Sequence, residues 1–329
     1  MRHKIIKWTN YEFWPFWLFY GPLTPWYIYK IFTAGAPAYF CTANPGIKWG
    51  GFINYSKIDL LNQIHEKFKP KTLFFKEIST QKPPMNFPFI AKPDEGERGI
   101  AVELIRDEND WKNYLSINHQ DLIIQEFNTF PLEFGAFYVK LPKEKKGKLI
   151  SMTGKDFLHF LGDGKSTFKE LIDSNIRAIF RKEYLLNRYA SELDRVLTKG
   201  EKVLIEPIGN HNRGTVFLDA TYLITPKLEA VIDEIAQNIK GFNYGRFDIK
   251  AESIEELQNG NFVILEVNGA NSEATHIYDP KHNLFFAYKE VIKHLGYQHK
   301  IAKQNNELGH SYTKWPLLAK ELIQRYQAN

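Results

Sequence analysis

The chain has 329 residues, enough for two or three modest domains, and only its aromatic content of 15% departs from an ordinary globular composition. With 43 Lys and Arg residues against 38 Asp and Glu residues, the formal net charge of +5 is too small to favour a nucleic acid as partner, although it suits anionic small molecules. The single cysteine, Cys41, excludes an intrachain disulfide and is typical of a protein in the reducing cytoplasm.

An aromatic-rich segment occupies residues 1–37. No charged residue lies between Phe13 and Tyr29, but prolines and a glycine interrupt this stretch, so it does not resemble a transmembrane helix. It also lacks the aliphatic run and the cleavage site of a signal peptide. Because Trp and Tyr favour lipid headgroups and basic residues flank the stretch, we expect peripheral membrane contact through residues 11–32, at the inner face of the membrane. The alternative is packing on the protein itself or on a partner subunit, as in a homodimer.

Residues 38–84 are expected to form a small α/β domain. Residues 38–43 and 72–75 have the composition of strands, and a helix is expected between them. Ser56 opens that helix, with Asp59 three residues later in a capping-box pattern. Strand, helix and strand in this order favour a parallel unit that ends near two consecutive prolines, Pro83 and Pro84.

Residues 85–141 begin with a strand over 87–93 that carries Lys92, and a second strand is expected over 100–104. The loop between them consists of Asp94, Glu95, Gly96, Glu97, Arg98 and Gly99. Glycines permit a tight loop whose backbone N–H groups face phosphate oxygens, and a nearby lysine adds a point charge. The alternative is an ordinary hairpin turn.

A third strand over residues 121–127 includes Gln125, Glu126 and Phe127, and Glu133 restarts a strand after a short connection. The end of a strand, followed by such a connection, is a place where backbone groups can bind a purine.

Residues 142–296 hold two candidate groups of polar side chains. Lys155 is a candidate second phosphate lysine, with a surface lysine as the alternative. Thr167 and Glu170 form a capping box that opens a helical stretch over 168–197. We expect this stretch to shape or cover the site where an acceptor substrate would bind. His211 and Arg213, flanked by glycines, are candidates to hold a carboxylate or a leaving phosphoryl group; a polar surface turn is the alternative.

The strongest candidate site lies on two strands over residues 244–250 and 261–269, joined by a polar connection. Pairing them brings Asp248 close to Glu266 and Asn268, with Arg246 on the same face as Asp248. Carboxylate and amide oxygens that leave positions open suit Mg²⁺, and Glu266 could bridge two such ions. The alternative is a solvated strand face. A helix over 284–295, closed by Gly296, and a C-terminal helical tail over 297–329 are expected to provide packing.

These segments, in this order, resemble the ATP-grasp ligases, most closely the D-alanine–D-alanine ligase and cyanophycin-synthetase-like branch, across roughly residues 70–295. The resemblance implies an α/β (α+β) fold with two α+β subdomains that clasp ATP. Phosphates would meet Lys92, the loop 94–99 and Arg246; adenine would lie at residues 125–127 and ribose at Glu133. Asp248, Glu266 and Asn268 would hold magnesium, with Mn²⁺ as a substitute.

The resemblance implies a cytoplasmic Mg-ATP-dependent ligase that joins a small-molecule carboxylate to an amine through an acyl phosphate. Two alternatives stay open. One is a membrane-docked nucleotide-binding protein without ligase activity, and the other is an ATP-dependent phosphotransferase acting on a small molecule.

Overall fold

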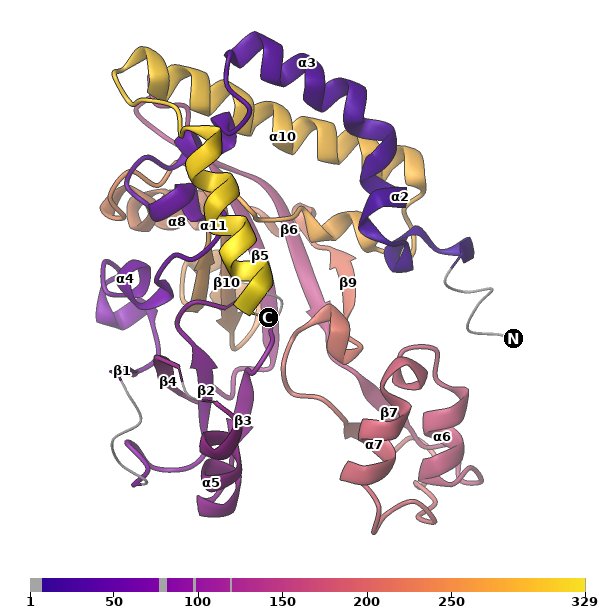
Figure 1. Cartoon of the computed structure of the whole chain (residues 1–329). Helices are drawn as coiled ribbons and strands as arrows, with labels where there is room; N and C mark the ends of the chain where they lie inside the picture. The colour runs from indigo at the N-terminus through magenta and orange to yellow at the C-terminus, as the bar shows by residue number, and fades with distance from the viewer. Residues whose placement is uncertain (1–7, 77–81, 97–98, 119, 329) are drawn as a thin grey trace.

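Two antiparallel sheets, with helices packed around them, form the framework of the protein (Figure 1). The structure is a computed structural model, and it describes residues 8–76, 82–96, 99–118 and 120–328. The predicted mixed α/β class with two α+β parts is confirmed. Among the described residues, no helix has the length and apolar character needed to cross a membrane.

The first sheet has four strands in the order β1-β4-β2-β3. Its strands are β1 (Thr72–Phe75), β2 (Phe89–Pro93), β3 (Glu103–Ile105) and β4 (Leu122–Glu126). Helix α5 (Glu108–Ile117) begins where the Asp107 carboxylate accepts hydrogen bonds from the backbone N–H groups of Asn109 and Asp110. The helix places Trp111 against the sheet, where Trp111 is fully buried beside Phe75 and Phe89.

Replacing Trp111 by alanine should lower the free energy of unfolding by about 3–5 kcal/mol, because the change leaves a large cavity in the core of this sheet. Chemical denaturation measures the loss. Trp17→Ala is the matched control, since the Trp17 side chain is 66% exposed and should change stability little. Equal effects of the two substitutions would contradict the packing described here.

The second sheet has five strands in the order β11-β10-β5-β6-β9. Its strands are β5 (Leu132–Val139), β6 (Lys148–Asp156), β9 (Val216–Asp219), β10 (Tyr244–Ala251) and β11 (Val263–Asn268). Helix α8 (Pro226–Asn238) covers one face with Leu228, Ile232 and Ile235, all buried. The pairing of β10 with β11 sets Asp248 opposite Glu266 and Arg246 opposite Asn268.

A smaller lobe follows β6 and carries β7 (His159–Leu161), β8 (Lys202–Leu204), α6 (Phe168–Ser174) and α7 (Lys182–Arg188). The predicted capping box at Thr167 is confirmed. The predicted continuous helical stretch over 168–197 is wrong, because α6 ends at Ser174. There the Asn175 side chain accepts hydrogen bonds from the backbone N–H groups of Arg177 and Ala178 and starts a new turn.

The aromatic segment forms helices α2 (Phe16–Tyr20) and α3 (Thr24–Ala34), and α3 lies beside α10 (Leu284–Glu307) in Figure 1. The predicted end of α10 at Gly296 is wrong, and so the predicted boundary after residue 296 falls inside this helix. The extension is held by buried amides: Gln298 donates to the carbonyl of Ala270, and Asn305 donates to the carbonyls of Thr42 and Ala43. Helix α11 (Trp315–Ala328) ends the described chain.

Residues 38–43 do not form the expected strand, and the parallel α/β unit is not observed. Tyr39–Ala43 is a 3₁₀ helix, η3, whose buried side chains pack against α10 instead of a sheet. The strand β1 joins the four-stranded sheet in antiparallel pairing with β4. The polar connection between β10 and β11 forms helix α9 (Ile254–Asn259), which Gly260 caps at a φ of 85°.

The Ser56 cap is confirmed, since its hydroxyl accepts from the N–H of Asp59 at the start of α4 (Lys57–Leu61). The remaining single turns are 3₁₀ helices. They are η1 (Tyr11–Phe13), η2 (Gly21–Leu23), η4 (Lys48–Gly51), η5 (Glu66–Phe68), η6 (Ala178–Arg181), η7 (His211–Arg213), η8 (Thr221–Leu223) and η9 (Thr275–Tyr278).

Candidate functional site

A cavity of about 1180 Å³ lies where the two sheets, the smaller lobe and the aromatic segment meet. Most of the residues that the sequence predicts as functional line it. They are Lys92, Gly99, Gln125, Glu126, Phe127, Glu133, Lys155, His211, Arg246, Asp248, Glu266 and Asn268. Of the other predicted residues, Glu95, Gly96 and Arg213 are not part of this lining, and Arg98 lies outside the described residues.

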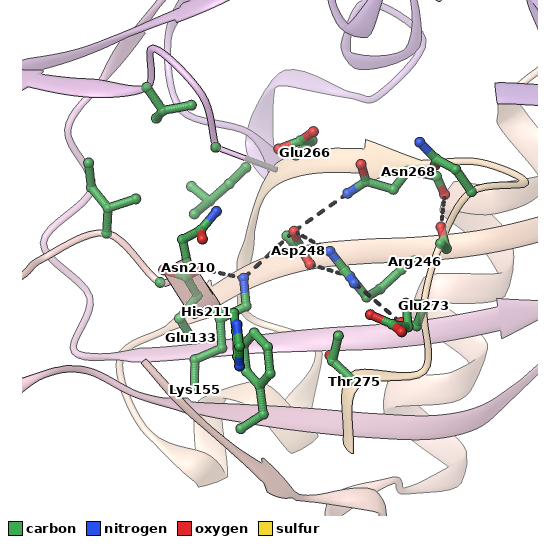
Figure 2. Close-up of a pocket in the computed structure, with 18 of the residues that line it drawn as sticks. Glu133, Lys155, Asn210, His211, Arg246, Asp248, Glu266, Asn268, Glu273 and Thr275 are labelled. Carbon is green, nitrogen blue, oxygen red and sulfur yellow. Dashed lines mark hydrogen bonds and ion pairs between the residues drawn. The ribbon is translucent and has the colours of Figure 1, made fainter. Parts of the chain in front are cut away.

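Asp248 lies at the centre of the cluster in Figure 2. The Arg246 guanidinium donates to both of its oxygens, at 2.8 and 3.2 Å, and the Lys155 ammonium lies 3.6 Å away. Burial would raise the pKa of Asp248, but Arg246 and Lys155 outweigh it and hold this pKa below its ordinary value. Asp248 is therefore an ionised carboxylate at neutral pH.

The donor set around Asp248 fits a magnesium ion. Glu266 is opposite Asp248 on the neighbouring strand, and the Asn268 amide is 3.5 Å from Asp248. Two carboxylates and an amide oxygen are hard ligands, and a cation would replace the hydrogen bonds that Asp248 now accepts from Arg246. The Asn268 Nδ2 donates to Asp248, and its Oδ1 accepts a hydrogen bond from the Tyr55 hydroxyl at 3.4 Å, so this amide would turn over for its oxygen to bind a cation.

Lys57 is a member of this site that the sequence did not reveal. It is the first residue of α4, its side chain is only 6% exposed, and its ammonium lies 3.3 Å from a Glu266 carboxylate oxygen. Burial would raise the pKa of Glu266, but Lys57 and Lys92 outweigh burial and lower it. The Ser56 cap predicted the helix start, but no local pattern shows that α4 points a lysine at a strand some two hundred residues away.

Lys92 is buried on β2, where its ammonium donates to the Leu265 carbonyl at 3.0 Å and to Gln125 at 3.3 Å. Burial lowers the pKa of Lys92 to about 8. The contact with Leu265 ties the four-stranded sheet to β11 of the five-stranded sheet. Lys92 is thus placed on the wall that faces the carboxylates.

Glu133 and Lys155 are directly opposite each other on β5 and β6, and their side chains form a 2.7 Å ion pair that is almost fully buried. Burial would lower the pKa of Lys155, but Asp248 and Glu133 raise it above its ordinary value. The structure therefore contradicts the alternative that Lys155 is a surface lysine. Lys250, which the sequence did not single out, also lines the cavity and donates to the Asn128 carbonyl at 3.1 Å.

His211 and Arg213 point in different directions. His211 lines the cavity, and its Nε2 is 3.0 Å from the carboxylate of Glu12, which Arg177 also holds at 2.7 and 2.9 Å. Arg213 instead donates to the Val102 carbonyl at 2.6 Å and to Glu103 at 2.8 Å. Its guanidinium thus lies toward β3 and pairs with a carboxylate of the protein itself, and a contact of Arg213 with a substrate carboxylate or phosphoryl group stays a prediction.

Gly269, the residue after Asn268, packs closely against another segment of backbone. Its Cα lies against the backbone of Gly50 and Gly51, and the Ala270 N–H donates to the Gly50 carbonyl at 3.0 Å. A side chain at Gly269 would collide with that backbone. Ser272 and Glu273, a few residues further on, line the cavity.

Comparison with known proteins confirms the resemblance drawn from the sequence, although no protein-family model matches the chain. It is 26% identical to a cyanophycin synthetase of Crocosphaera subtropica over 225 residues, which are 62% of this chain and 25% of that protein. It is also 26% identical to a cyanophycin synthetase of Synechocystis sp. over 211 residues, 58% of this chain and 24% of that protein. The chain thus spans about a quarter of the length of these relatives.

Among solved structures, a D-alanine–D-alanine ligase from Bacillus anthracis superposes with a TM-score of 0.39 at 10% identity, covering 76% of this chain and 65% of that one. A bifunctional glutathione synthetase from Pasteurella multocida gives a TM-score of 0.38 at 12% identity, covering 72% of this chain and 36% of that one.

Proposed function

We propose that this chain is a Mg-ATP-dependent ligase that joins a carboxylate to an amine through an acyl phosphate. The observation that carries the proposal is the pairing of an acidic cluster, Asp248 and Glu266, with buried lysines from three separate segments around one cavity. Lys57, Lys92 and Lys155 hold positive charge where a triphosphate would need it. The similarity to cyanophycin synthetases supports the same reaction class.

In this proposal, Asp248, Glu266 and Asn268 hold magnesium, which neutralises charge on the phosphates. Residues 125–127 border the adenine, and Glu133 meets the ribose. The lysines position the γ-phosphate for attack by a substrate carboxylate, and Arg246 stabilises the charge that develops on the transferred group. Since phosphoryl transfer depends mainly on positioning and electrostatics, this density of charged groups accounts for the first step without a general base.

The experiment that tests this function is a screen for ADP release with pooled carboxylates combined with amino acids, amino sugars and lipid amines. Hydroxylamine is added in parallel, because it converts an acyl phosphate into a stable hydroxamate. ADP together with an amide or a hydroxamate supports the ligase. A phosphorylated product without an amide would support the phosphotransferase instead, and Mg-nucleotide binding with no ADP under any condition would support the nucleotide-binding protein without ligase activity.

The low pKa of Lys92 gives a test by pH. Below about pH 8 its ammonium is charged and attracts a triphosphate; above this pH the empty site loses that charge. The dissociation constant for Mg-ATP should therefore rise above pH 8, by up to about tenfold for each pH unit while one proton is taken up on binding. Calorimetry from about pH 6.5 to about pH 9.5 measures this dissociation constant.

Lys92→Arg is the control for that series, since a guanidinium stays charged throughout this range. Its affinity profile should be flat. A wild-type profile that is equally flat would show that Lys92 does not meet the phosphates.

Peripheral membrane contact, a homodimer and the domain boundaries stay predictions.

A further inference from the structure

Glu273 differs from the other buried or half-buried acidic residues of the cavity. Each of those has a cationic partner within 3.3 Å. The pairs are Glu12 with Arg177, Glu133 with Lys155, Asp248 with Arg246, and Glu266 with Lys57. Within the described part of the chain, the Glu273 carboxylate forms no ion pair. The Arg246 guanidinium donates to the backbone carbonyl of Glu273 at 3.3 Å, but its charge is paired with Asp248.

The Glu273 carboxylate is held instead by two phenols. The hydroxyl groups of Tyr20 and Tyr278 both donate to the same oxygen, Oε1, the latter at 2.8 Å. Burial, followed by the charge of Glu273, raises the pKa of both phenols well above their ordinary value, so both stay protonated donors. The carboxylate is thus fixed in position, and its second oxygen accepts no hydrogen bond from the described residues.

Aromatic rings surround this carboxylate, and most of them come from the N-terminal segment. The Tyr20 ring lies 4.6 Å from Phe16 and 4.9 Å from Phe19, and Tyr278 lies 6.1 Å from Phe19 and from Tyr11. All of these residues line the cavity. A fixed negative charge among ring faces suits a cation with an apolar body, because the carboxylate binds the charge and the rings contribute cation–π contact and burial.

This compartment adjoins the proposed metal cluster. Figure 2 shows Glu273 next to Arg246 and close to Asp248. The segment that carries Glu273 is fastened there by Ser272, whose hydroxyl donates to the Asn268 carbonyl at 2.8 Å. A group bound at Glu273 therefore lies on the side of the cavity where an acyl phosphate would form.

We propose that Glu273, braced by Tyr20 and Tyr278, binds the ammonium group of the acceptor substrate, and that this acceptor is a primary amine on an aromatic or other apolar body. The inference rests on the proposed function for the reaction, but the binding of the amine is a separate property of the structure. It also assigns a task to the N-terminal aromatic segment, which supplies part of the wall of this subsite.

The test is calorimetric titration with phenethylamine, a protonated aromatic amine at neutral pH, with and without Mg²⁺ and a non-hydrolysable ATP analogue. The neutral 3-phenylpropan-1-ol, of similar size, is titrated in parallel. Glu273→Gln is the test variant, because its amide oxygen still accepts from the two phenols. Glu307→Gln is the matched control, since Glu307 is half-exposed and pairs with Lys143.

We expect Glu273→Gln to weaken phenethylamine binding at least tenfold, to leave the alcohol unchanged, and to keep the nucleotide affinity within twofold; the control should match the wild type. Binding of phenethylamine that is equal in Glu273→Gln and wild type, or absent from the wild type, would overturn the subsite. Failure of the wild type to bind the Mg-nucleotide would overturn the proposed function instead, and the amine titration without nucleotide would still decide the subsite.

Discussion

Asp248→Asn is expected to lower ATP-dependent turnover by about 10³-fold or more, because the substitution removes the anionic oxygen at the centre of the proposed metal cluster. An amide keeps the shape of the side chain but cannot supply the charge that holds a divalent cation against a triphosphate. ADP release under saturating Mg-ATP is the measurement. Full activity of the Asp248→Asn protein would remove Asp248 from the metal site.

A loss of folding has to be separated from that loss of activity. Asp248 is buried with Arg246 and Lys155, so its replacement leaves two cations with a weaker partner. Breaking a buried pair costs about 3–5 kcal/mol when a charge is left unpaired. Here Glu133 still pairs with Lys155, which limits the cost. Thermal unfolding of Asp248→Asn, beside the surface control Asp173→Asn, shows whether the inactive protein is folded.

Lys57→Met is the second large effect, with an expected fall in kcat of about 10²-fold. The substitution keeps the buried stem but removes the ammonium that lies 3.3 Å from Glu266. The Glu266 carboxylate then loses a cation that holds its pKa down, and the triphosphate loses one of three lysines. ADP release under saturating Mg-ATP measures the change.

Lys48→Met is the control for this prediction, since the Lys48 side chain is 54% exposed and pairs with Glu321 on the far tail of the chain. Lys57→Arg should recover part of the activity, because it restores the charge with a different shape. A Lys57→Met protein as active as Lys48→Met would show that α4 contributes packing and no charge to the site.

The grouping of Asp248, Glu266 and Asn268 could be predicted from the sequence because a strand places alternate residues on one face. Glu266 and Asn268 are two apart on β11, and the pairing with β10 brings Asp248 opposite Glu266 and Arg246 opposite Asn268. The pairing of Glu133 with Lys155 was out of reach, because it depends on the register between β5 and β6. That register is fixed by how the whole sheet packs, with a bulge between Phe137 and Tyr138.

The wrong predictions share a cause, which is that local composition does not fix long-range contact. Residues 38–43 are apolar and small enough for a strand, but α10 offers them a helical surface to pack on. The contact of the Arg213 guanidinium with the Val102 carbonyl, just before β3, is likewise a long-range contact that no sequence periodicity sets. Glu12 and Tyr20 lie in the cavity because the N-terminal segment folds back onto the rest of the chain. Their partners, Arg177 and Glu273, are distant in sequence, so these contacts could not be inferred from it.

The most direct test of the account is a calorimetric titration of the whole chain with ATP in the presence and absence of Mg²⁺. The cavity brings the carboxylates of Asp248 and Glu266 together with lysines from α4, β2 and β6, a charge pattern that suits a metal–nucleotide complex. We predict one saturable site that requires magnesium in the wild type and is lost in Asp248→Asn. Equal binding with and without magnesium, or no binding at all, would contradict it.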